Sequence, residues 1–191
     1  MTLWFLARAT GIATFLSFTV AVTLGATASI RTLPVPAAVD RRFMLQMLHR
    51  SGAITGLALL LTHVATIVID SYVDVSVTSA LVPFASPYKT VAVAVGTTAL
   101  WGVLVVACAG LLRGRLAASD RAARNWRMVH SLAYAIWPVM LLHGLLAGTD
   151  KGSAWLQLLY LGALLCVGGG SIRRLYAERR HRRSPRALVR G

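Results

Sequence analysis

The sequence predicts an all-α, integral membrane helical bundle with five transmembrane helices, the N-terminus outside and the C-terminus inside. Composition, apolar runs and charge distribution support this fold class. Hydrophobic residues make up 57% of the 191 residues and charged residues only 14%, whereas a soluble domain carries about a quarter charged residues. Two cysteines are too few for a disulfide scaffold, and so apolar a chain is not a disordered one.

Five apolar runs are each long enough to cross a hydrocarbon core of about 30 Å at the helical rise per residue. Turn-forming residues separate them, notably Pro34 and Pro36 after the first run, Pro83 and Pro87 before the third, and Gly148 before the fifth. The predicted helices cover approximately Leu3–Leu24, Phe43–Ile69, Thr90–Leu112, Trp126–Ala147 and Ala154–Tyr176.

The positive charges predict the orientation. Seventeen of the twenty Lys and Arg residues lie in the first loop, the third loop and the C-terminal segment. The other three are Arg8, Lys89 and Lys151. Positive residues stay in the cytoplasm, so these loops and the C-terminus are expected inside.

Two domains follow from this orientation: a transmembrane bundle over residues 1–176 and a basic cytoplasmic tail over residues 177–191. The tail sequence RRHRRSPRALVR is typical of an anchor on anionic lipid, and docking of a partner is the alternative. We expect a multi-pass protein of the cell membrane, of the bacterial inner membrane type, and no nucleic acid as partner.

The end of the first run allows another interpretation. Ala26-Thr27-Ala28 resembles a signal-peptidase site, which would make residues 1–28 a cleaved signal. The long apolar stretch and the single Arg before it favour a retained transmembrane helix.

Four histidines are the titratable side chains that lie well inside the predicted spans: His49, His63, His130 and His143. All six acidic residues fall at loops or in the tail. Polar groups in lipid are costly and mark functional sites.

The spacing of the histidines predicts two facing pairs. His49 and His63 are 14 residues apart, about 21 Å along a helix and nearly four whole turns. His130 and His143 are 13 apart, about 20 Å by the same rise. Because both helices enter from the inside, His49 faces His130 at the inner level and His63 faces His143 at the outer level. This arrangement suits two haems, each held axially by two neutral imidazoles.

The 13-residue spacing fits this arrangement less well, since it leaves the two side chains well over a quarter-turn out of line. Pro138 lies between them, and we expect a proline kink there to rotate one half of the helix relative to the other.

Other uses of the histidines are less favoured. A single intramembrane histidine often forms a hydrogen bond between helices. Such bonding does not explain why two histidines on each of two helices lie at matching depths. One zinc or copper ion cannot bridge pairs some 20 Å apart with metal–nitrogen bonds of about 2 Å. A proton relay would include carboxylates.

Further residues are candidates for contact with a haem. Arg50 and Arg127 adjoin the inner histidines and could pair with propionates, as Arg8 could at the outer level; the alternative for each is an interface anchor. Trp137 lies midway between His130 and His143 and could lie between the haems, or simply fill the core.

Small residues near the histidines have two interpretations. Gly52 and Gly56 follow His49 and would let a macrocycle approach the backbone, or they serve helix packing. Cys108 and Cys166 are expected to be small buried hydrophobes. No CxxCH motif is present, which excludes covalent c-type haem.

Three segments together carry a family resemblance: LWFLARATG at Leu3–Gly11, LHRSGAITG at Leu48–Gly56 with His63 following, and NWRMVHSLAY at Asn125–Tyr134 with His143 following. On these the sequence resembles the ferric-reductase-like transmembrane domain family. That family includes ferric reductases, the membrane domain of NADPH oxidases and the haem subunit of bacterial methionine sulfoxide reductase systems.

The resemblance implies two non-covalent haem b groups that pass single electrons between the membrane faces. His49 and His130 would ligate the iron of the inner haem, and His63 and His143 that of the outer. Full-length reductases of the family continue into flavin and nicotinamide domains, whereas a basic segment of fifteen residues follows the last predicted helix here. A flavin is therefore not expected on this chain.

We therefore expect a di-haem b cytochrome, the electron-transfer subunit of a membrane oxidoreductase and not a complete reductase alone. It would have no catalytic side chains of its own and would relay electrons between a separate donor and acceptor, either proteins or small molecules. The alternatives are a haem-free membrane anchor or assembly subunit whose histidines bond between helices, and a cytochrome with a single haem.

Overall fold

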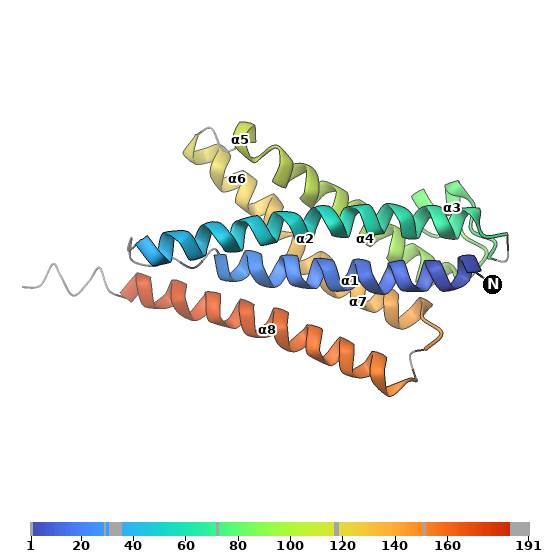
Figure 1. Cartoon of the computed structure of the whole chain (residues 1–191). Helices are drawn as coiled ribbons and strands as arrows, with labels where there is room; N and C mark the ends of the chain where they lie inside the picture. Colours follow the sequence, from blue (N-terminus) through green and yellow to red (C-terminus); the bar gives the residue numbers. More distant parts are fainter. Residues whose placement is uncertain are drawn as a thin grey trace, which may run out of the picture.

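The computed structural model describes residues 2–28, 30, 36–71, 73–116, 119–150 and 152–183, and these ranges contain α-helices and no strand (Figure 1). The helices are α1 (Thr2–Ala28), α2 (Pro36–Ile69), α3 (Val77–Leu81), α4 (Thr90–Leu111), α5 (Arg113–Leu116), α6 (Asp120–Ser131), α7 (Ala133–Ala147) and α8 (Ala154–Arg183). Within these ranges, five segments are long and apolar enough to cross a membrane: α1, α2, α4, α6 with α7, and α8. The all-α class and the five spans are thus confirmed.

Helix ends differ from the sequence prediction in the polar regions. Helix α2 begins at Pro36, seven residues before Phe43, and α8 continues to Arg183, seven residues past Tyr176. Arginine and glutamate favour helices almost as strongly as leucine, so a helix need not stop where hydropathy falls. Arg31, Pro34, Lys151, Arg186, Arg190 and the side chains of His181, Arg182 and Arg183 lie outside the described part of the chain.

The bundle consists of two packed pairs and one covering helix. Helix α2 packs along α1, and α7 packs along α4 with α6 continuing the contact. Helix α8 covers α1 on the side away from α2 (Figure 1). In the described residues α2 makes little or no contact with α6 or α7, so the two pairs meet mainly through α1 and α7.

A small apolar core joins α1, α7 and α8. It contains Phe15, Trp137, Leu141, Ala163 and Val167. The Trp137 ring stacks on Phe15 with 5.6 Å between centroids, and its indole N–H donates to Oγ1 of Thr19 at 2.9 Å. A buried indole needs such a partner, so this hydrogen bond orients α7 on α1.

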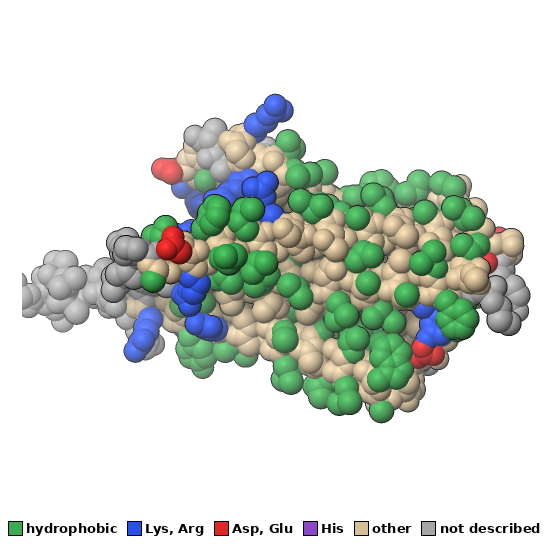
Figure 2. Space-filling model, viewed as in Figure 1, with side chains coloured by type: hydrophobic (Ala, Val, Ile, Leu, Met, Phe, Trp, Pro, Cys, Tyr) green, Lys and Arg blue, Asp and Glu red, His purple; other side chains and the backbone are tan. Residues whose placement is uncertain are grey.

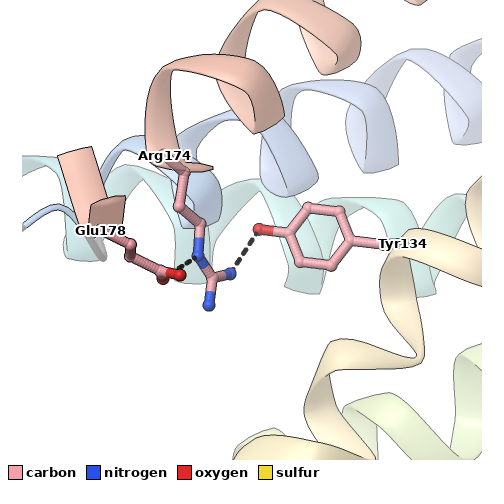
Figure 3. Close-up of polar contacts among 3 residues, drawn as sticks. All are labelled: Tyr134, Arg174 and Glu178. Atoms are coloured by element: carbon pink, nitrogen blue, oxygen red, sulfur yellow. Dashed lines mark hydrogen bonds and ion pairs between the residues drawn. The ribbon is translucent and has the colours of Figure 1, made fainter. Parts of the chain in front are cut away.

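Polar contacts tie the helices at both ends. Near the end of α8, Arg174 donates to the Tyr134 hydroxyl at 2.9 Å and to Glu178 at 3.0 Å (Figure 3). At the opposite end, the Arg8 side chain pairs with Asp150, which links α1 to the loop after α7.

The fourth predicted span is interrupted at Leu132, between α6 and α7. The N–H of Leu132 bonds Val129 O at 3.1 Å, and that of Ala135 bonds Leu132 O at 2.9 Å. These are i to i−3 bonds, and the φ of −56° and ψ of −20° at Leu132 are those of a 3₁₀ turn. Such a turn advances each residue by about 120° instead of about 100°.

The kink expected at Pro138 stays a prediction, since α7 is helical through Pro138 and the irregular turn lies six residues earlier, at Leu132. A proline ring opposes the carbonyl four residues earlier, which here is that of Tyr134, so its effect falls on the turn just after Leu132. The extra rotation of a 3₁₀ turn, about 20° per residue, has the direction that reduces the misalignment of a 13-residue spacing and offsets part of it.

We predict that Trp137→Ala lowers the free energy of unfolding by about 3–5 kcal/mol, the usual loss for a buried tryptophan. Trp137 is 4% exposed, whereas Trp155 on α8 is 51% exposed, so Trp155→Ala serves as a matched control with little effect. Denaturant unfolding in detergent micelles would measure both. Equal losses would contradict the assignment of the core to α1, α7 and α8.

Candidate metal centre: two facing histidine pairs

The four intramembrane histidines meet in two pairs. The ring centroids of His49 and His130 are 6.1 Å apart with an interplanar angle of 80°. Those of His63 and His143 are 6.4 Å apart at 77°. These are the pairs that the sequence spacing selects. Each pair joins α2 to the α6–α7 segment, which otherwise make little contact.

A backbone carbonyl on a neighbouring helix accepts a hydrogen bond from each ring. On α1, Ala21 O accepts from His49 Nδ1 at 2.7 Å and Ala7 O from His63 Nδ1 at 2.8 Å. On α4, Val106 O accepts from His130 Nδ1 at 3.3 Å and Ala92 O from His143 Nδ1 at 2.9 Å. A carbonyl can only accept, so Nδ1 carries the proton in all four rings.

A glycine lies against every one of these rings. Each glycine follows the residue with the accepting carbonyl by four positions. The pairs are Ala21 with Gly25, Ala7 with Gly11, Val106 with Gly110 and Ala92 with Gly96. A β-carbon added at Gly11 would lie 3.0 Å from Cε1 of His63, and one at Gly96 would lie 2.6 Å from Cε1 of His143. We call each carbonyl with its glycine a histidine seat.

The seats explain how a helix carbonyl can hold an imidazole. In a helix the carbonyl of residue i already accepts the N–H of residue i+4, so the ring uses the second lone pair. A side chain at i+4 would stand over this lone pair, and glycine leaves it accessible. Within each helix the seats recur every 14 residues, which keeps them on one face, about 21 Å apart.

The pairs fit a metal bound between two imidazoles. With Nδ1–H donated to a carbonyl, the neutral ring presents the Nε2 lone pair, the arrangement found in most metal-ligating histidines. Two metal–nitrogen bonds of about 2.0 Å and two ring radii of about 1.1 Å place the centroids about 6.2 Å apart. The separations of 6.1 and 6.4 Å in the structure are compatible with that value.

The donor set favours a macrocycle over a bare ion. In the described ranges no group of three or more His, Cys, Asp or Glu side chains could hold a metal. Two imidazoles are too few for zinc, which takes four protein ligands in structural sites and three in catalytic ones. A haem brings four nitrogens of its own and needs two axial ligands, which each pair can supply.

The arginines predicted near the haems lie at the expected ends of the bundle. Arg50 follows His49 on α2, Arg127 precedes His130 on α6, and both are exposed. Arg8 follows Ala7, whose carbonyl accepts from His63, and its guanidinium is paired with Asp150 and lies 4.3 Å from the ring centre of Trp4. Contact of these three residues with propionates stays a prediction.

Two predicted neighbours of the haems have other partners in the structure. Trp137 is stacked on Phe15 in the core, at a depth between the two histidine levels, and its contact with a haem stays a prediction. Gly52 and Gly56 face α1, where β-carbons would meet Ala21 and Phe18. The structure thus supports helix packing, one of the two interpretations of these glycines.

Sequence reasoning missed the seats and one aromatic ring. The signal for the seats is the 14-residue spacing of Gly11 and Gly25 and of Gly96 and Gly110, which equals that of His49 and His63. Trp126, four residues before His130, stacks on it with 5.3 Å between centroids and an interplanar angle of 14°. An i, i+4 spacing on a helix was the available signal.

We predict that Gly96→Ala displaces His143, whereas Gly110→Ala leaves His130 in place. The added carbon would lie 2.6 Å from His143 but 3.4 Å from His130, which is ordinary contact. Added haem should therefore show a lost or single-histidine site in Gly96→Ala and an unchanged absorption spectrum in Gly110→Ala. Equal behaviour of the two variants would contradict the role of the seats.

Comparison of the chain with protein-family models, with curated proteins and with solved structures finds no match. The resemblance to the ferric-reductase-like family therefore stays a prediction from three sequence segments. Inference about function rests on the geometry of the two histidine pairs.

Proposed function

We propose that this chain is a di-haem b membrane cytochrome that relays single electrons across the bilayer between a separate donor and acceptor. The observation that carries the proposal is the pairing of four Nδ1-bonded imidazoles at separations that accommodate one metal each. When bound, haem iron would supply one-electron oxidation and reduction.

The side chains would hold the groups and set their spacing. His49 with His130, and His63 with His143, would supply the axial nitrogens, and the seats would fix the tautomer and plane of each ring. The helix rise between seats separates the two levels by about 21 Å. Apolar side chains around the spans would keep water from the sites, which favours transfer of electrons over side reactions.

The charge distribution supports an orientation. Figure 2 shows Lys and Arg side chains gathered at the end of the bundle where α5 and α6 lie. By the positive-inside rule this end would be cytoplasmic, which places the N-terminus outside and the His49–His130 pair at the inner level. In this proposal the protein is a multi-pass component of the cell membrane, the bacterial inner membrane in particular. The basic tail would lie on anionic lipid.

One observation favours the alternative of a haem-free anchor. The four Nδ1 bonds are themselves contacts between helices, so the histidines could serve packing alone. Packing uses only one nitrogen of each ring, however, and does not require the rings to face each other in pairs. Haem content separates the two functions.

We predict that the detergent-purified chain, expressed with adequate haem supply, binds two haems with a low-spin b-type spectrum. Haem-to-protein stoichiometry and oxidised and dithionite-reduced spectra would measure this. A haem-free chain would overturn the proposal and leave the anchor. One haem would mean that one of the two pairs is not a ligand pair.

We predict that His63→Ala or His143→Ala removes one haem and leaves the spectrum of the other. The two levels have separate seats about 21 Å apart, so losing one should not dismantle the other. The matched controls are His49→Ala and His130→Ala, which should remove the opposite haem. Transfer of electrons across proteoliposomes should stop in all four variants. Loss of both haems in each single variant would contradict independent sites.

A further inference from the structure

His130 is held differently from the other three histidines. Its bond to the seat carbonyl is 3.3 Å, against 2.7 to 2.9 Å for the others. Its glycine is also the most distant, with a β-carbon at Gly110 lying 3.4 Å from the ring. A longer bond constrains a ring less, so something else must fix His130.

Trp126 supplies the missing constraint. Its indole lies nearly parallel to the His130 ring, with 5.3 Å between centroids. In the described residues, the other ring contacts of the four histidines are those within the two facing pairs. Only His130 also contacts a further aromatic ring, that of Trp126. Stacking from one face limits rotation of the imidazole about its long axis.

The indole is itself fixed by the end of α4. Its N–H donates to Ala109 O at 2.8 Å, one of the last carbonyls of α4, which have no partner within the helix. Arg113, just beyond that end, places its guanidinium 5.2 Å from the Trp126 ring centroid. The indole thus contacts both the Arg113 guanidinium and the His130 imidazole.

These contacts bring a positive charge close to one of the two proposed haem sites. The guanidinium lies 5.2 Å from the indole centroid and the indole centroid lies 5.3 Å from that of the imidazole. The charge is therefore within about 10 Å of the His130 ring, about one Debye length at 0.1 M salt. At the other level, Arg8 is neutralised by its pairing with Asp150. Reduction of iron removes one positive charge, so a nearby cation stabilises the reduced form and raises the reduction potential.

We propose that Arg113 and Trp126 are positioning residues that raise the reduction potential of the haem held by His49 and His130. Trp126 orients the His130 ring and holds the Arg113 charge beside it. The inference rests on the proposed function, because it concerns the potential of a haem that this pair would bind. It adds an asymmetry between the two sites that the four ligands alone do not provide.

A spectroelectrochemical titration of the full-length haem-loaded protein would test the inference, with the His63→Ala variant used to assign the two transitions. Arg113→Gln should shift the His49–His130 transition to lower potential and leave the other unchanged. Arg113→Lys keeps the charge and should restore the parent value. Arg115→Gln, which removes an exposed charge on the same short helix, should shift the transition much less. Trp126→Leu should lower the potential and change the low-spin electron paramagnetic resonance signal of that haem.

The outcomes separate this inference from the function on which it rests. A parent protein without haem would overturn both. A two-haem parent in which Arg113→Gln moves neither transition, or moves it as much as Arg115→Gln, would overturn the inference alone. Equal shifts of both transitions in Arg113→Gln would also overturn it, because a general surface charge would then be responsible.

Discussion

The bond between an imidazole Nδ1 and a backbone carbonyl of the neighbouring helix is the interaction on which the bundle depends. A polar group left unpaired in an apolar medium costs several kcal/mol. In the described residues each of the four Nδ1 atoms bonds a helix carbonyl. The chain reaches these carbonyls by placing glycine one turn further on. Each histidine-bearing segment is thus bound to its own seat helix, α2 to α1 and α6–α7 to α4.

This arrangement makes helix geometry, and not loop structure, responsible for the spacing of the two sites. Each seat helix, α1 and α4, carries two seats. In each seat the glycine follows the accepting residue by four positions, and the second seat follows the first by 14 residues. Fourteen residues return to nearly the same face of a helix, so each seat helix holds two rings in line. The one departure is the 13-residue spacing on α6–α7, and a 3₁₀ turn at Leu132 lies between these two histidines.

Hydropathy and spacing made the spans and histidine pairs predictable, because both depend on periodicity within one helix. Residues that depend on which helices are neighbours were not predictable in the same way. For Gly52 and Gly56 the sequence left approach of a macrocycle and helix packing both open, and the structure places them against α1. Gly11 and Gly96 are close to the rings of His63 and His143 because α1 packs along α2 and α4 packs along α7. Likewise, the sequence alone did not predict the 3₁₀ turn at Leu132 between His130 and His143.

The unused ring nitrogen supports the proposed metal site over a packing role alone. The hydrogen bonds of the four rings to the described chain all use Nδ1. In a neutral imidazole whose Nδ1 donates, Nε2 is an acceptor. Two such rings with centroids 6.1 or 6.4 Å apart bring two acceptors into one apolar region. A packing role would leave both lone pairs without a donor, which is costly away from water. A metal ion accepts from both lone pairs at once, so the same geometry that is unfavourable for an empty bundle is favourable for a bis-histidine centre.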